Sequence, residues 1–216
     1  MRIVLLALAA ALSLSACAAS TATVISSSGP SIAEAQAEPA NGRKPRIAVQ
    51  PFDARDQGPG VGAGMGEMLT DALFNTNKFI VVERDRLKDV LGEQDLGDSG
   101  RFKKGTVAPK GQLEGAELII RAAITTFEKN CSGGSIIIAS AKEACIAINI
   151  RIIDVASGRV VNATTVEATS ANRGIGLLYT RSNLPIGLGA FSNTPMEKAI
   201  RNAIELAVNH IASTKL

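Results

Sequence analysis

Few side chains in this sequence could carry out chemistry. The 216 residues include one His, three Cys and no Trp. No Cys-x-x-Cys occurs, and a single His is too little for most zinc sites. No paired-carboxylate, Ser-His-Asp or Cys-His arrangement stands out as catalytic machinery. We therefore expect no enzyme, no metal site and no cofactor.

Cys17 is the residue for which the sequence indicates a reaction. A short positive start, Met1-Arg2, is followed by an apolar stretch, Ile3–Leu14, which is shorter than a membrane-spanning helix. Leu14-Ser15-Ala16-Cys17 resembles the bacterial lipobox, in which the Cys thiol is acylated before the chain is cut. The alternative is an ordinary secretory signal with a Cys at this place by chance. The lipobox predicts a signal peptide over residues 1–16 and lipidation of Cys17.

The residues after Cys17 indicate where the chain is anchored. Ala18 follows the Cys, whereas an Asp at that position typically retains a lipoprotein in the inner membrane. We therefore expect a lipid anchor at the periplasmic face of the outer membrane. Residues 17–45 are rich in Ala, Ser, Thr and Glu without apolar periodicity, which predicts a lipidated flexible tether. A net charge of +3 without clustered Lys and Arg argues against nucleic acid as a partner.

A glycine-rich segment stands at the start of the folded part. Arg46–Phe52 is typical of a strand ended by proline, and the glycines of 56–66 precede apolar residues at helical spacing. A phosphate-binding loop occurs in this context, but the spacing fits neither G-x-G-x-x-G nor a P-loop. We expect the glycines to let the loop and the helix N-terminus pass close to a neighbouring backbone.

The remaining apolar patterns predict alternating strands and helices. Strands are predicted at 78–83, 117–127, 145–155 and 159–168, and the last two are joined by a hairpin turn. Helices are predicted at 85–94 and 106–113. Together these elements predict an α/β (α+β) fold over 46–216, with a mixed sheet flanked by helices.

The last helix has the clearest signals. Thr194 is suited to the N-cap, Pro195 to the first helical position and Glu197 to a capping box. One apolar stripe follows from Met196 onward. We expect His210, which lies off that stripe, to be on the solvated face of the helix.

The order of these segments resembles the CsgG family. The resemblance covers about residues 46–212 and is carried by Arg46–Phe52, Gly66–Leu73, Phe79–Asp85, Leu91–Gln94, Leu113–Ile120, Asp154–Val161 and Phe191–Arg201. It implies a periplasmic domain that assembles into a homo-oligomeric ring. Its implied partners are secreted fibre or adhesin subunits and accessory envelope proteins.

The resemblance also implies that each subunit lends two β-hairpins to a shared transmembrane barrel. The candidate segments are about 125–145 and 165–191. A crossing arm needs about 9–11 residues with one apolar face; the first outgoing arm is short, and the apolar face of the second segment is thin. The membrane-facing side chains of such hairpins would be Ile138, Leu184, Ile186 and Leu188.

Cys131 and Cys145 flank the first of these segments. They are the thiols that remain once Cys17 is lipidated, an even number in an oxidising compartment. A disulfide between them and two buried free thiols both remain open.

Two classes of function fit the sequence. The first is a subunit of an outer-membrane ring that secretes or anchors extracellular fibre or adhesin proteins. The second is a non-porous periplasmic lipoprotein that scaffolds an envelope or surface structure. In the curli channel of this family, a loop after the first strand carries aromatic and Asn side chains that form a constriction. The corresponding loop here, from Asp53 to Gly64, carries no aromatic residue. The constriction therefore has no counterpart, and the cargo need not be a curli subunit.

Overall fold

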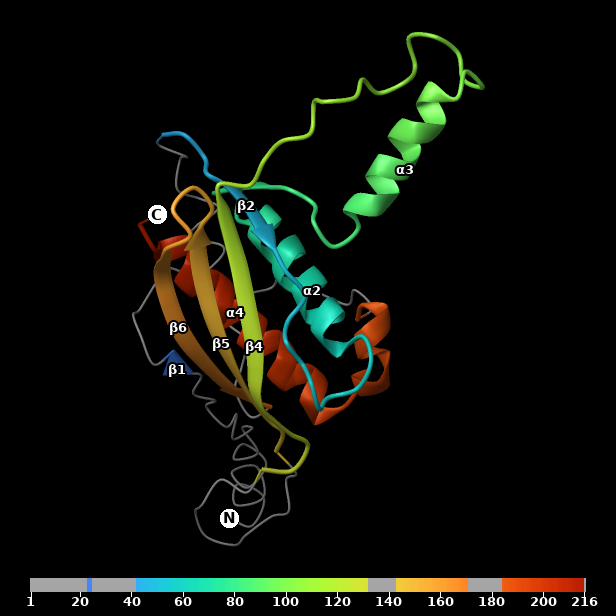
Figure 1. Ribbon diagram of the computed structural model, residues 1–216. Coiled ribbons are helices and arrows are strands. Elements are labelled where there is room, and N and C mark those ends of the chain that lie inside the picture. The colour runs from blue at the N-terminus through green and yellow to red at the C-terminus, as the bar shows by residue number, and fades with distance from the viewer. Residues whose placement is uncertain (1–22, 25–41, 132–142, 171–183, 216) are drawn as a thin grey trace, which may run out of the picture.

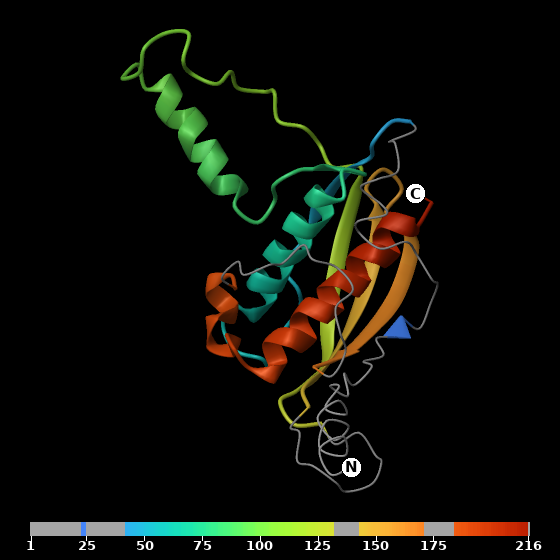
Figure 2. The same cartoon turned by 180° about the vertical axis from the view of Figure 1, so that it is seen from behind.

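The structure is a computed structural model that describes residues 23–24, 42–131, 143–170 and 184–215. Its strands form a six-stranded sheet in the order β1-β6-β5-β4-β2-β3. β2 (Arg46–Val49) is parallel to β3 (Ile80–Val81) and β4 (Leu118–Glu128). The two following strands, β5 (Cys145–Asp154) and β6 (Val160–Thr169), continue the sheet antiparallel to β4. Helices α2 and α4 cover one face (Figures 1 and 2), which confirms the predicted mixed sheet with flanking helices.

The side chains of β5 show why one face of the sheet is covered. Ile146, Ile148, Ile150 and Ile152 are buried in the core, whereas Asn149 and Arg151 between them are exposed. This alternation follows from the two-residue period of a strand. The apolar side packs against the helices, and no described helix covers the opposite side, called here the open sheet face (Figures 1 and 2).

Helix α2 (Val61–Asn75) and helix α4 (Pro195–Ser213) supply the other half of the core. α4 begins as the sequence predicts. The Thr194 hydroxyl accepts a hydrogen bond from the Glu197 N–H at 3.4 Å, and the Glu197 carboxylate accepts one from the Asn193 N–H. The reciprocal bond thus reaches one residue further back than in a standard capping box.

His210 is buried, so the prediction that it lies on the solvated face of its helix is wrong. Only 6% of its surface is exposed, and Nε2 lies 3.0 Å from the Asn162 Oδ1 of β6. The prediction is wrong because α4 lies across β6 and buries more of its circumference than the apolar stripe.

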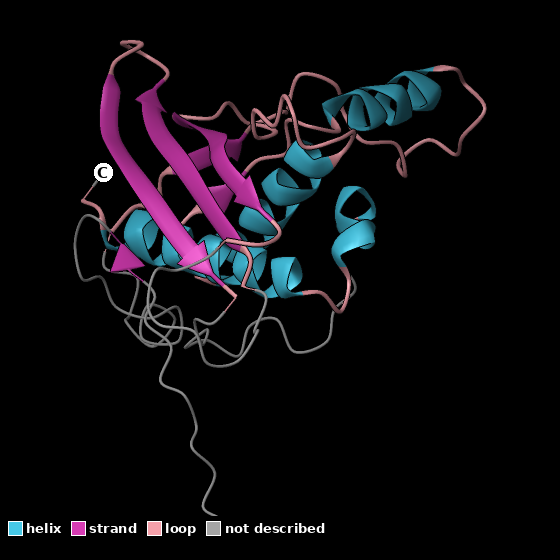
Figure 3. Cartoon of the chain, turned by 90° about the horizontal axis from the view of Figure 1, so that it is seen from below, coloured by secondary structure: helices cyan, strands magenta, loops and turns pink. Residues whose placement is uncertain are grey.

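Helix α3 (Leu87–Asp98) stands away from the body of the molecule beyond the β3 side of the sheet (Figures 1 and 3). None of its residues is buried. The helix predicted at 106–113 does not form: this segment is irregular, with left-handed glycines at Gly105 and Gly111. It folds back on α3, where Val107 packs on Gly97 and the Lys110 ammonium lies 2.8 Å from the carboxylates of Asp95 and Asp98.

Two further segments differ from expectation. β1 (Thr23–Val24) lies within the predicted tether, yet it pairs with β6 through Thr23–Glu167 and Val24–Val166. This pairing covers part of an otherwise open sheet edge. The returning strand predicted before Phe191 is instead a 3₁₀ helix, η2 (Ile186–Phe191). Pro185 precedes it, and proline disfavours a strand interior because it has no N–H to donate.

Candidate functional site

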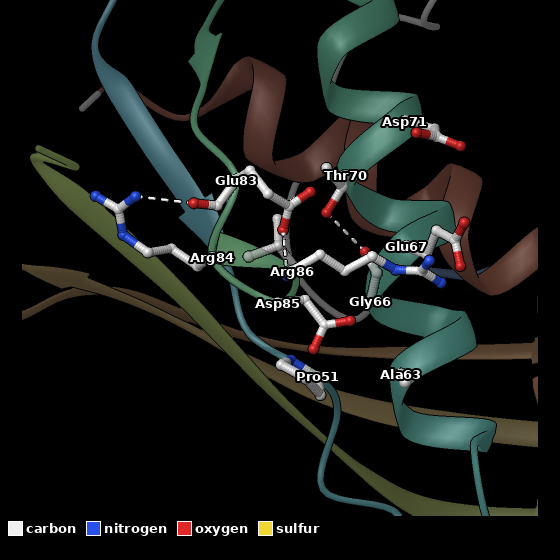
Figure 4. Close-up of a pocket in the computed structure, with 11 residues that line it drawn as sticks. Pro51, Ala63, Gly66, Glu67, Thr70, Asp71, Glu83, Arg84, Asp85 and Arg86 are labelled. Carbon is white, nitrogen blue, oxygen red and sulfur yellow. Dashed lines mark hydrogen bonds between the residues drawn. The ribbon is translucent and has the colours of Figure 1, made fainter. Parts of the chain in front are cut away.

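A cavity of about 230 Å³ lies between α2 and the segment that follows β3 (Figure 4). The polar face of α2 supplies Glu67, Thr70 and Asp71, and the last two lie three and four residues after Glu67, so both neighbour it on the helix surface. The full lining is Val49, Pro51, Ala63, Gly66, Glu67, Thr70, Asp71, Glu83, Arg84, Asp85 and Arg86. The Thr70 hydroxyl donates to the Gly66 carbonyl at 2.8 Å, so it is already engaged within α2.

The wall of the cavity is rich in charge. Burial, and then the charge of Glu83, raises the pKa of Asp71 above its ordinary value. Glu83 itself accepts a hydrogen bond from the backbone N–H of Arg86 at 3.0 Å. The Arg84 guanidinium donates to the carbonyls of Glu83 and Glu114 at 2.8 and 3.1 Å. Arg84 thus fixes the backbone at the base of α3 rather than presenting all its donors to the cavity.

This arrangement can form ion pairs and hydrogen bonds, and its lining contains no Ser, Cys, Lys or His. Its volume is below the roughly 300–1,000 Å³ of most small-molecule sites. Within the described ranges, no group of three or more His, Cys, Asp or Glu side chains is placed to hold a metal ion.

The glycines of α2 serve close packing, as the sequence predicts. A Cβ on Gly60 would lie 2.9 Å from the Gly187 Cα, and one on Gly64 would lie 2.9 Å from the Leu188 Cγ. A Cβ on Gly66 would lie 3.2 Å from the Pro51 Cα. η2 therefore packs on the first turns of α2, the place where a phosphate-binding loop would hold its ligand.

The cysteines of the first candidate hairpin lie together. Cys131 and Cys145 are joined in a disulfide with their Cα atoms 5.8 Å apart. The Cys131 N–H also donates to the Glu143 carbonyl at 2.9 Å. The disulfide stands at the end of the β4–β5 ladder, where Glu128 pairs with Cys145. Cys17 and Ile138 lie outside the described residues.

The second candidate hairpin requires a correction. Leu188 has no exposed surface, and Leu184 is half-buried against the same core, whereas Ile186 is 94% exposed. Leu184 and Leu188 therefore do not face outward. The prediction assumed a strand, in which every second side chain shares a face. In the 3₁₀ helix the residues three apart, Leu188 and Phe191, point into the core together.

The sequence did not predict this cavity, because its two walls come from separate segments of the chain. Its α2 half has a signal, because Ala63, Glu67, Thr70 and Asp71 recur at helical spacing on the face opposite Leu69 and Leu73. Its other half, residues 83–86, comes close to α2 only through the parallel pairing of β3 with β2, which the spacing of residues does not reveal. None of the described helices combines the length and apolarity needed to cross a bilayer.

The family model described as "Curli production assembly/transport component CsgG" matches residues 29–215. Curated relatives with this description from Salmonella typhimurium LT2 and Escherichia coli K12 are 26% and 25% identical over 177 residues. The matches cover 74% of this chain and 64% of each relative. A solved PelC dodecamer from Paraburkholderia phytofirmans aligns with a TM-score of 0.41 at 16% identity, over 71% of this chain and 86% of that chain. Because the family model matches most of its length, the chain belongs to the CsgG family.

Proposed function

We propose that the chain is an envelope lipoprotein, anchored through Cys17 at the periplasmic face of the outer membrane. Its copies assemble into a ring that secretes or anchors extracellular fibre or adhesin proteins. The family match over residues 29–215 is the observation that carries this proposal. The lipobox at Cys17 supports the location, and the curated relatives are curli production assembly/transport components.

The strand ends support a shared role for the two candidate hairpins. In the sheet register, Glu128 pairs with Cys145, and Cys145 pairs with Thr169. Glu128 and Thr169 therefore lie on either side of Cys145 at one end of the sheet. The segments that follow Glu128 and Thr169 start at this same end, from the two strands that flank β5, as a subunit that contributes two hairpins to one assembly requires.

The disulfide favours the second candidate function, a non-porous lipoprotein that scaffolds an envelope or surface structure. Cys131 and Cys145 are 14 positions apart, whereas each membrane-crossing arm needs about 9–11 residues. On the near side of the disulfide, Ala122, Ile146 and Ile148 are buried in the core and are not available to lipid. The first hairpin, closed in this way, is short for a crossing.

Fractionation of cells that express the full chain tests the proposal. We expect the wild type to incorporate labelled fatty acid and to sediment with the outer membrane, and Cys17→Ser to lose both properties. Fatty-acid labelling of the Ser variant would contradict lipidation at Cys17. Conductance of the purified wild type in planar bilayers then separates the two candidates, because only a secretion ring conducts.

A further inference from the structure

The open face of the sheet carries two arginines directly opposite each other. Arg121 of β4 pairs with Arg151 of β5, and both side chains are exposed. Neither forms an ion pair with another described residue. Like charges directly opposite on neighbouring strands destabilise a sheet. The two arginines therefore repel each other in the isolated chain, and a pair of negative charges bound to them would relieve this repulsion.

Small side chains surround the two arginines. Ala163 of β6 lies opposite Arg151, and Ala123 of β4 lies opposite Asn149 on the same face. Ile119 and Ile153 form the next pair along. An apolar pair thus lies beside the charged one, and the nearby Asp53, which bridges to Ala123, is already ion-paired with Arg55.

Helix α3 carries the complementary arrangement. Asp89 and Glu93 are exposed and four residues apart, so they lie on one face with like charges. Within the described part of the chain, neither carboxylate has an ion-pair partner, whereas Asp95 and Asp98 are bound to Lys110. On the same face, Leu96 is 46% exposed, and no atom lies within 4 Å of the position of a Cβ on Gly92.

The two charge pairs match in spacing. Side chains four apart on a helix have Cβ atoms about 5–6 Å apart, and those opposite on antiparallel strands have Cβ atoms about 4.5–5.5 Å apart. We propose that α3 of one copy docks on the open sheet face of an adjacent copy, with Asp89 and Glu93 against Arg121 and Arg151. Each surface then relieves the like-charge repulsion of the other.

A second copy is the fitting occupant because one chain presents both surfaces. α3 stands beyond the β3 side of the sheet, with no buried residue to hold it against its own body (Figure 1). A contact between two different surfaces of identical chains is heterologous, and such contacts close into rings when the rotation permits. The inference rests on the proposed homo-oligomer and names the surfaces that build it.

Charge reversal tests the contact in the full, detergent-extracted chain by sedimentation velocity. We expect Arg121→Glu with Arg151→Glu to raise the concentration for half-assembly at least about tenfold, and Asp89→Lys with Glu93→Lys to do the same. The four changes combined should restore assembly. The matched control is Arg159→Glu with Lys198→Glu, which reverses two exposed charges on neither surface and should leave assembly unchanged. Circular dichroism checks that each variant is folded.

A cross-linking pair gives a readout that does not depend on loss of assembly. Gly92→Cys and Asn149→Cys in one chain should form disulfides between copies on oxidation, whereas Gly92→Cys with Lys198→Cys should not. If both charge-reversal variants oligomerise as the wild type does, and Gly92→Cys with Asn149→Cys forms no cross-link between copies, this contact is overturned. The ring itself would then stand. Loss of binding to anionic vesicles in the Arg variants, with assembly unchanged, would assign the arginines to the membrane and overturn it as well. A wild type that stays monomeric would overturn the homo-oligomer itself.

Discussion

Gly62 sets how closely the first turn of α2 approaches the chain that leaves β2. A Cβ at this position would collide with the carbonyl oxygen of Phe52. The Phe52 N–H donates to the Gly62 carbonyl at 2.9 Å, so the two backbones are joined as well as close. Phe52 is itself buried in the core. A side chain at residue 62 would therefore displace backbone, which cannot move aside as a flexible side chain can.

Gly62→Ala should lower the free energy of unfolding by about 1–3 kcal/mol, as overpacking in a core does. Urea denaturation measures it. Gly92→Ala is the matched control: Gly92 is also helical, but a Cβ there meets nothing within 4 Å, so the substitution should leave stability unchanged or raise it by up to about 1 kcal/mol. Equal stability of the two variants would contradict the close contact at Gly62.

At the residue scale, the sequence was informative where local geometry decides the outcome. The close-packing role of the α2 glycines could be predicted because no phosphate-binding spacing was present. The burial of His210 could not, because it depends on where β6 lies beneath α4. Leu188 was misplaced for a related reason: its burial depends on a 3₁₀ helix that packs on Gly64, a contact far apart in the sequence.

Helix α4 begins with a set of charged and polar contacts that depend on pH. Burial raises the pKa of Glu197, but the hydrogen bond from the Asn193 N–H and the Arg201 guanidinium outweigh burial and leave that pKa below its ordinary value. A carboxyl group with a lowered pKa stabilises the fold above its unfolded pKa, near 4.3. The contribution is lost as the pH falls through the lower pKa of the folded state.

Glu197→Gln should therefore be less stable than the wild type at pH 6, and this difference should shrink toward pH 3. Urea unfolding at both pH values measures the difference. Glu93→Gln removes an exposed carboxylate from a helix that has no buried residue, and we expect it to change stability little at either pH. A Glu197→Gln deficit that is the same at both pH values would contradict the role of the charged carboxylate.

The disulfide at the end of the β4–β5 ladder predicts the state of the thiols. In the unreduced, unfolded wild type no thiol should be alkylated, because Cys131 and Cys145 are paired and the proposed lipid would occupy the Cys17 thiol. In Cys131→Ser, Cys145 should react. Mass spectrometry of the alkylated chain gives the count. Two alkylated residues in the unreduced wild type would show that the thiols are free.

At the element scale, strong periodicity gave the right element types and weak periodicity did not. The alternating pattern of β5 and the cap of α4 fixed both elements close to their observed bounds. The pattern at 106–113 has helical spacing, but Gly105 and Gly111 take left-handed conformations that a helix excludes. The amphipathic pattern of 85–94 predicted the helix but not its position. None of the residues of α3 is buried, so no core contact fixes where the helix lies.

At the scale of the whole molecule, two surfaces of the domain have no partner within the described chain. The open sheet face carries Arg121 and Arg151, and α3 carries Asp89 and Glu93. The strand ends at Glu128 and Thr169 lie at one end of the sheet, on either side of Cys145. A ring in which α3 covers the neighbouring sheet would place these strand ends around one axis, where the segments that follow them could act together.

Electron microscopy of the full chain, extracted with detergent from the membranes of cells that express it, tests the proposed assembly most directly. We expect class averages of closed rings with rotational symmetry, built from copies of this chain alone. Arg121→Glu with Arg151→Glu should yield dispersed single domains under the same conditions. Wild-type particles that remain single domains at every concentration, while still lipidated and membrane-associated, would contradict a ring-forming function.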